Sequence, residues 1–201
     1  MAISINEVTN AIVYERLNDK IPERSTSELI TILKETNTQL ILRAYFRWLP
    51  LENCNIFPNP SYERTYCTTY GSTHAQNTAI NTAIKTELPN ILIIGAIPAQ
   101  RILKVYEYDE YTSTQLTSVQ TEAMALDPSK WGISSPTKSE LQASLILSSG
   151  NNAWYPDLTN TNVQTLLLNW AKRQIDSGVD GIWIDMLFNQ TVTMYSITNS
   201  I

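Results

Sequence analysis

The segment from Gly178 to Met186 constrains the fold of this chain more than any other stretch. It reads Gly-Val-Asp-Gly-Ile-Trp-Ile-Asp-Met, so a glycine suited to ending a helix is followed by a short apolar run and an aspartate. A run that is apolar on both faces is typical of a parallel strand covered by helices. Asp185 follows that run directly, and the active sites of parallel α/β folds are built at the carboxyl ends of the strands. The segment therefore predicts a fold class and the place of one chemical group.

Four apolar runs have the length and composition of strands. They are residues 11–14, which continue toward Leu17, and then residues 40–46, 91–97 and 181–186. The first three runs are bounded by polar residues or proline, and the fourth follows Asp180, which is typical of buried strands.

Helical patterns lie between these runs. The first is expected over residues 27–36, after the capping-box spacing of Ser25 and Glu28. The second is expected over residues 73–88 and is ended by Pro89, and the third begins near residue 159 or 160 and ends at Gly178. Strands and helices that alternate in this way predict right-handed βαβ units around a parallel sheet.

The expected fold class is α/β, with parallel β/α units of the TIM-barrel type. A complete (β/α)8 barrel needs eight strands and about 250 residues, whereas this chain has 201 residues and four convincing strands. We therefore expect a single domain over residues 1–201 that forms a partial, about four-stranded barrel, with a small open α/β sheet as the alternative. Residues 98–158 are expected to form a large insertion over the carboxyl ends of the strands, because such excursions often carry substrate loops.

Composition narrows the expected partners. The net charge is −5 and no run of basic residues is present, which argues against binding to nucleic acid or to an anionic membrane. Charged residues make up only 16% of the chain, so many surface positions are neutral and suit a hydroxyl-rich ligand. His74 is the only histidine, and no glycine-rich phosphate loop occurs, so no cofactor and no metal are expected.

The cellular compartment stays open at this stage. The N-terminal residues lack the apolar core of a signal peptide, so the protein is either cytoplasmic or secreted with its signal trimmed. Cys54 and Cys67 stand thirteen residues apart in one polar segment. They would form a disulfide in an exported protein and would otherwise be two free thiols.

Two motifs resemble the α-glucosidase and α-galactosidase group of retaining barrel glycosidases. Residues 180–186 resemble the fourth-strand motif of that group, and residues 155–160 resemble a Pro-Asp-Phe-Thr-Asn segment of α-glucosidases. The likeness covers residues 154–186, and a looser likeness extends to other glycosidase-like barrels. It implies that Asp185 is the catalytic nucleophile and that Trp183 shapes the barrel mouth. The chain departs from the group at Leu187 and Phe188, where the group has Asn-Glu, and the group's general acid lies on a later strand.

Glycoside hydrolysis commonly uses two carboxylates, roughly 5 Å apart in retaining enzymes. Asp185 is the candidate nucleophile or base, and the alternative is a structural aspartate that caps the turn after its strand. Glu15, which follows the first strand, is the candidate second carboxylate, although an ion pair with Arg16 would also explain it. Three further acidic residues, at positions 107, 109 and 110, lie among tyrosines in the insertion. They could approach the same mouth from above, but a solvated loop is the expected place for them.

The expected ligand-binding residues are arginines and tryptophans near strand ends, together with one loop aspartate. A guanidinium in an apolar strand must face a carboxylate or the solvent-filled mouth of the barrel. Tryptophans can stack on the apolar faces of sugar rings. Each of these residues also has a structural explanation, either in an ion pair, in the core or in a loop anchor. The residues are Arg43, Arg47, Trp48, Trp154, Asp157 and Trp183.

The expected function is that of a glycoside-hydrolase-like protein that acts on a saccharide through Asp185. The alternative is a non-catalytic carbohydrate-binding or structural half-barrel that needs a partner or a missing C-terminal half. Four strands leave two sheet edges unpaired. A homo-oligomer in which two half-barrels close into one barrel is therefore a further alternative.

Overall fold

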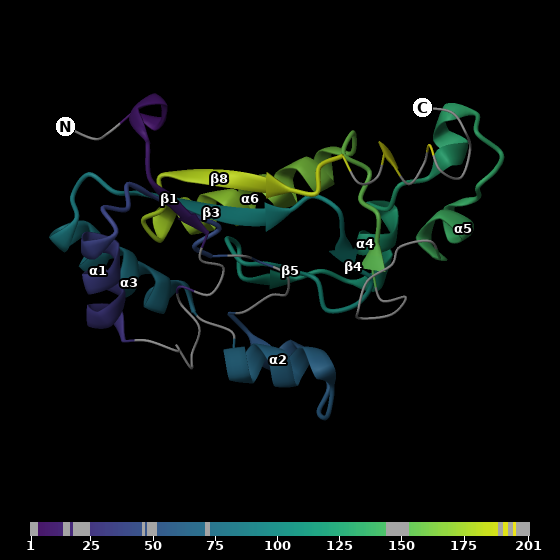
Figure 1. Cartoon of the computed structure of the whole chain (residues 1–201). Coiled ribbons are helices and arrows are strands. Elements are labelled where there is room, and N and C mark those ends of the chain that lie inside the picture. The colour runs from purple at the N-terminus through teal and green to yellow at the C-terminus, as the bar shows by residue number, and fades with distance from the viewer. Residues whose placement is uncertain are drawn as a thin grey trace. The chain divides into compact units, whose positions relative to one another are not determined.

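The computed structural model of the chain describes residues 4–13, 17, 25–45, 47, 52–70, 73–143, 153–188, 191–192 and 195. The chain divides into two compact units. Figure 1 traces the helices and strands of the chain. The first unit is Met1–Ile97 with Trp170–Trp183, and the second is Pro98–Asn169 with Ile184–Ile201. Within the described ranges, no helix combines the length and the apolar character that crossing a membrane requires.

The central feature of the fold is a four-stranded parallel sheet. Its strands are β1 (Ala11–Val13), β2 (Leu40–Leu42), β3 (Leu92–Pro98) and β8 (Gly181–Asp185), and their spatial order β1-β2-β3-β8 follows the chain. All four strands predicted from the sequence are confirmed. The second is shorter than expected, because Arg43 takes a left-handed φ of 57° directly after Leu42. The fold is therefore α/β with a parallel sheet, as expected.

The helices between these strands are also confirmed, and their ends show why they form. α1 (Thr26–Glu35) begins with a capping box, in which Ser25 and Glu28 each bind the other's backbone N–H. α3 (His74–Glu87) begins with the same arrangement at Thr73 and Gln76. α6 (Thr161–Asp176) is followed by Gly178 at a φ of 94°, a left-handed conformation that glycine adopts without strain.

One face of the sheet packs against α1, α3 and α6. Ile12, Ile41 and Ile93 stand in register across three strands, and they belong with Ile182 to the core that includes residues of α1 and α3. α6 approaches the same face at Gly95, where a Cβ atom would collide with the side chain of Gln174. These three helices therefore cover a single face.

Strand side chains alternate between the two faces of a sheet, so a second set of residues lies on the other side. We call this side the opposite face. Its members on the four strands, identified by alternation from the isoleucine row, are Ala11, Val13, Leu40, Leu42, Leu92, Ile94, Ala96, Pro98, Gly181, Trp183 and Asp185. None of α1, α3 and α6 covers them.

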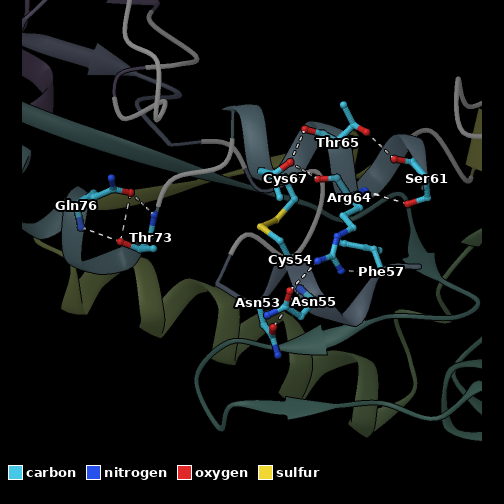
Figure 2. The surroundings of a disulfide bond; sticks show 11 residues. Asn53, Cys54, Asn55, Phe57, Ser61, Arg64, Thr65, Cys67, Thr73 and Gln76 are labelled. Atoms are coloured by element: carbon cyan, nitrogen blue, oxygen red, sulfur yellow. Dashed lines mark hydrogen bonds between the residues drawn. A yellow bond between two sulfur atoms is a disulfide. The ribbon is translucent and has the colours of Figure 1, made fainter. Parts of the chain in front are cut away.

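A disulfide cross-links the segment between β2 and α3 (Figure 2). Cys54 and Cys67 are bonded, with Cα atoms 5.6 Å apart, so the pairing left open by the sequence is settled. The bond joins the short 3-10 helix η2 (Cys54–Ile56) to α2 (Tyr62–Tyr70), a helix that the sequence pattern did not predict. The guanidinium of Arg64 adds hydrogen bonds to the Phe57 carbonyl oxygen at 3.2 Å and to Asn55 Oδ1 at 2.9 Å.

The second unit consists of short elements. The strands β4 (Ile102–Leu103) and β7 (Ala153–Trp154) pair antiparallel, and so do β5 (Tyr108–Asp109) and β6 (Thr114–Gln115). The helices are α4 (Ser118–Ala123), η3 (Pro128–Trp131) and α5 (Lys138–Ala143). A small apolar cluster of Leu126, Leu141, Ala153 and Tyr155 forms part of the core of this unit.

Candidate functional site

The two aspartates of the β8 motif have different surroundings. Asp180, just before the strand, accepts the backbone N–H of Ile93 at 2.8 Å through Oδ2 and pairs with Lys85 Nζ at 2.6 Å through Oδ1. It therefore aligns β8 with β3 and anchors α3, which is a structural role. Asp185, at the other end of the strand, falls by alternation on the same side as Gly181 and Trp183.

Asp185 lies at the carboxyl edge of the sheet. Its backbone carbonyl oxygen accepts the N–H of Ala99 at 2.9 Å, so the end of β8 is held beside the end of β3. Its side chain is partly buried. Met186 follows with a left-handed φ of 58°, close to the 57° of Arg43 after β2. Non-glycine residues adopt this conformation at an energetic cost, and such strained positions cluster at functional sites.

The segment that follows β3 is buried and polar. Gln100 is 3% exposed and Arg101 is 6% exposed, directly after Ala99. The Oε1 atom of Gln100 has no hydrogen-bond partner among the described residues. Buried polar groups in native proteins are nearly always hydrogen-bonded, so Gln100 Oε1 is an exception among the described residues.

The acidic residues after β4 are not in a solvated loop, and that expectation was wrong. Glu107 is 1% exposed, and its carboxylate accepts the N–H groups of Leu103 at 2.6 Å and Tyr108 at 3.0 Å. These bonds to both oxygens pin the turn between β4 and β5. Glu107 is thereby used to hold the backbone.

Asp109 is engaged in the same way. Its Oδ1 accepts the N–H groups of Tyr111 and Thr112, and its Oδ2 accepts Asn169 Nδ2 at 2.7 Å. Glu110 is 2% exposed. The burial of all three acidic residues replaces the solvated loop that was expected. The sequence offered a weak signal for it, since tyrosines flank the three acidic residues.

The two arginines after β2 have different environments. Arg43 is partly buried. Arg47 is 1% exposed, and its Cζ atom lies 3.6 Å from the centre of the Trp170 ring, while its backbone N–H donates to the Ala96 carbonyl oxygen at 3.2 Å. A guanidinium stacked on an indole ring in this way is a stabilising cation–π contact. Arg47 therefore packs in the core of the first unit, whereas Arg43 retains partial solvent access.

The two described tryptophans of the expected site lie in different units. Trp154, on β7, is partly buried and has Lys104 Nζ at 4.3 Å and Lys138 Nζ at 5.1 Å from its ring centre. Trp183, on β8, is 46% exposed and belongs to the opposite face of the sheet. Only Trp183 presents a half-open ring on the strand that ends in Asp185.

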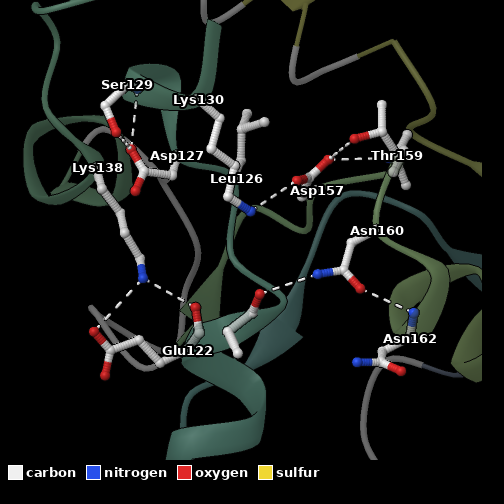
Figure 3. Close-up of polar contacts among 12 residues, drawn as sticks. Glu122, Leu126, Asp127, Ser129, Lys130, Lys138, Asp157, Thr159, Asn160 and Asn162 are labelled. Atoms are coloured by element: carbon white, nitrogen blue, oxygen red, sulfur yellow. Dashed lines mark hydrogen bonds and ion pairs between the residues drawn. The ribbon is translucent and has the colours of Figure 1, made fainter.

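Asp157 organises the loop before α6 (Figure 3). It is 3% exposed, and its Oδ1 accepts the Thr159 N–H at 3.0 Å and hydroxyl at 2.6 Å, while its Oδ2 pairs with Lys130 at 3.2 Å. Burial alone would raise the pKa of this carboxyl group, but the bonds from Thr159 and Lys130 together lower it below the ordinary value of 3.8. Asn160 then caps α6 by accepting the Asn162 N–H. Both carboxylate oxygens of Asp157 are therefore engaged in contacts that hold the loop.

Two of the expected site residues, Glu15 and Trp48, lie outside the described residues. The single histidine lies deep in the first unit, where His74 Nδ1 is 3.1 Å from Ser177 Oγ. That hydroxyl donates to the Arg173 carbonyl oxygen at 2.9 Å, so the ring N–H is the donor toward it. This buried pair ties the start of α3 to the residue that follows α6.

Within the described part of the chain, no group of three or more histidine, cysteine, aspartate or glutamate side chains is placed to hold a metal ion. Comparison with models of protein families, with curated proteins and with solved structures found no match. What the chain does must therefore be argued from its own geometry.

Proposed function

We propose that this protein is a glycoside-hydrolase-like protein that acts on a saccharide, with Asp185 as nucleophile or base. One observation carries the proposal. Asp185 ends a parallel strand at the carboxyl edge of the sheet, beside the end of β3, with its side chain partly open to solvent. In parallel β/α folds the catalytic and ligand-binding residues lie at this edge.

The order of the sheet supports a partial barrel of the TIM type. The strands follow one another in space as they do in the chain, and α1, α3 and α6 cover one face only. Doubly wound sheets instead reverse their strand order and carry helices on both faces. Winding in a single direction with the helices outside is the arrangement of a (β/α)8 barrel, and it would place Asp185 on the inner side.

A non-catalytic carbohydrate-binding protein is the second candidate. It is favoured by the engagement of Glu107 and Asp109, because their carboxylates are occupied by backbone and amide donors. Turnover would then need its acid from Glu15, the second carboxylate that the sequence analysis offers.

We also infer that the protein matures in an oxidising compartment. The bond between Cys54 and Cys67 supports this, since structural disulfides form and persist in secreted proteins and are rare in reducing cytosol.

The experiment is a turnover assay on a panel of aryl α- and β-glycosides and polysaccharides, with Asp185→Asn and a control, Asp176→Asn. Asp176 is the exposed last residue of α6. Positioned carboxyl groups contribute about 10²–10⁴-fold to rate, so we expect Asp185→Asn to lose at least that much with an unchanged melting temperature. Full activity of Asp185→Asn would refute the catalytic proposal. Saccharide binding by a wild type without turnover would establish the second candidate.

A further inference from the structure

Two lysine ammonium groups converge on one indole ring in the second unit. Lys104 Nζ lies 4.3 Å and Lys138 Nζ lies 5.1 Å from the centre of the Trp154 ring. β4 and β7 pair antiparallel with Ile102 opposite Trp154. Lys104 comes two residues after Ile102, so it is a diagonal neighbour of Trp154 on the same side of the ladder. Lys138 is the first residue of α5, and two separate segments therefore bring like charges to the same ring.

The charge of Lys104 is not balanced by a carboxylate of its own unit. Its Nζ atom has no hydrogen bond and no ion pair among the residues that the structure describes. The side chain is partly buried, and an ammonium group that is partly removed from water is costly unless an anion compensates it. No aspartate or glutamate occurs among the remaining residues of the second unit, which are 144–152, 189–190, 193–194 and 196–201.

Lys138 has one acidic neighbour in contact, and this neighbour is held weakly. Lys138 Nζ donates to the Glu122 carbonyl oxygen at 2.9 Å and lies 3.5 Å from Glu122 Oε1 (Figure 3). The Glu122 side chain is 61% exposed, and exposed ion pairs contribute little to stability. Asp127 lies near Lys138 as well, but its Oδ1 is held by the N–H and the hydroxyl of Ser129. Glu122 can therefore turn into solvent and leave Lys138 to a different anion.

The indole ring adds a third donor at the same place. Trp154 Nε1 is shielded from solvent and has no acceptor in the described part of the chain. Cation–π contacts with the ring stabilise the two ammonium groups, but they do not supply an acceptor for their N–H groups. The surroundings of Trp154 are thus rich in donors and poor in acceptors.

We propose that Lys104 and Lys138 bind the carboxylate of an acidic saccharide, a uronate, beside the Trp154 ring. Ammonium groups form strong, charge-assisted hydrogen bonds with a carboxylate, and an indole ring packs against the apolar face of a sugar. A neutral saccharide would leave the charge of Lys104 uncompensated. For the class of ligand the inference rests on the saccharide function proposed above, whereas the anion site rests on the two lysines.

The test is calorimetric titration with an oligogalacturonate and with its fully methyl-esterified form, which is the same sugar with its carboxylates masked. We expect the acid to bind at least 10-fold more tightly than the ester. Lys104→Met keeps the apolar stem and removes the ammonium group, so it should weaken binding of the acid about 10-fold, as expected for one lost hydrogen bond between charged groups. Lys172→Met, at an exposed lysine of α6, is the matched control and should bind as the wild type does.

Glu122→Gln should change the affinity in the opposite direction. It removes the carboxylate that competes for Lys138, so the acid should bind more tightly, a gain that a poorly folded variant cannot imitate. Equal affinities for acid and ester, no binding of the acid, wild-type affinity of Lys104→Met, or weaker binding by Glu122→Gln would each overturn the proposal. Binding of this pattern by a protein that turns over no glycoside would refute the catalytic proposal alone. Turnover without such binding would overturn this inference alone.

Discussion

The backbone carbonyl oxygen of Asp185 accepts a hydrogen bond from the backbone N–H of Ala99 at 2.9 Å. The same two strands are joined near their starts by the pair of Asp180 N–H and Ile93 carbonyl oxygen at 2.7 Å. Residue numbers rise together along both strands, so β8 runs parallel to β3. This pairing puts a partly buried carboxyl group next to the buried polar segment that follows β3.

Gly95 permits the close approach of α6 to the sheet. Gly95→Ala should destabilise the protein by about 1–3 kcal/mol, because the new Cβ atom would overlap the amide of Gln174 and overpacking costs energy of this size. Urea denaturation measures the change. Gln174→Ala alone loses the hydrogen bond from Nε2 to the Ala96 carbonyl oxygen, so the double variant completes a cycle. Strictly additive effects would show that the two residues do not meet.

The disulfide should stabilise the first unit. Cys54→Ser with Cys67→Ser should lower the free energy of unfolding by about 3 kcal/mol, the value expected for releasing a loop of this length in the unfolded chain. Thermal unfolding with and without reductant measures it. The double serine variant should not respond to reductant. An equal response of wild type and variant would contradict the assignment.

Asp157 should make stability depend on pH. Its pKa is lowered in the folded protein, so its contribution is present above the unfolded value of 3.8 and is lost as the pH falls through the folded pKa. Asp157→Asn keeps an acceptor for Thr159 but not the ion pair with Lys130, so it should cost about 1–2 kcal/mol at pH 7 and less below pH 3.8. Asp176→Asn is the exposed control. A cost that is independent of pH would contradict this account.

Replacing Met186 with glycine should stabilise the folded protein. Its φ of 58° is left-handed and its side chain is 43% exposed, so Met186→Gly removes strain with little loss of packing. We expect a gain of about 0.5–1 kcal/mol. Met186→Val should instead destabilise, because β-branched residues resist this conformation. Chemical denaturation of both variants measures the difference, and the same sign for both would refute the argument.

Local features of the chain were predictable because their causes are local. The capping box at Ser25 and Glu28, the stop at Pro89 and the apolar run after Gly178 each act within a few residues. For that reason the strands and helices of the sheet were found close to their observed bounds, except that the second strand ends at Leu42 and not near residue 46. The placement of Asp185 at a strand end followed from the same pattern.

Other features needed the tertiary structure, because their partners are distant or are backbone groups without a sequence signature. Nothing in the polar stretch around Glu107 shows that the N–H of Leu103 turns back to meet its carboxylate. The burial of Arg47 depends on Trp170, more than a hundred residues away.

The amino-acid sequence by itself therefore determined the strand and helix periods, the caps and the acidic end of β8, since each arises from neighbouring residues. The tertiary structure decided that Cys54 and Cys67 are bonded, that Asp157 and Glu107 are held by structural contacts, and that three helices share one face of the sheet. Burial and pairing arise only when segments far apart in the chain are packed against each other.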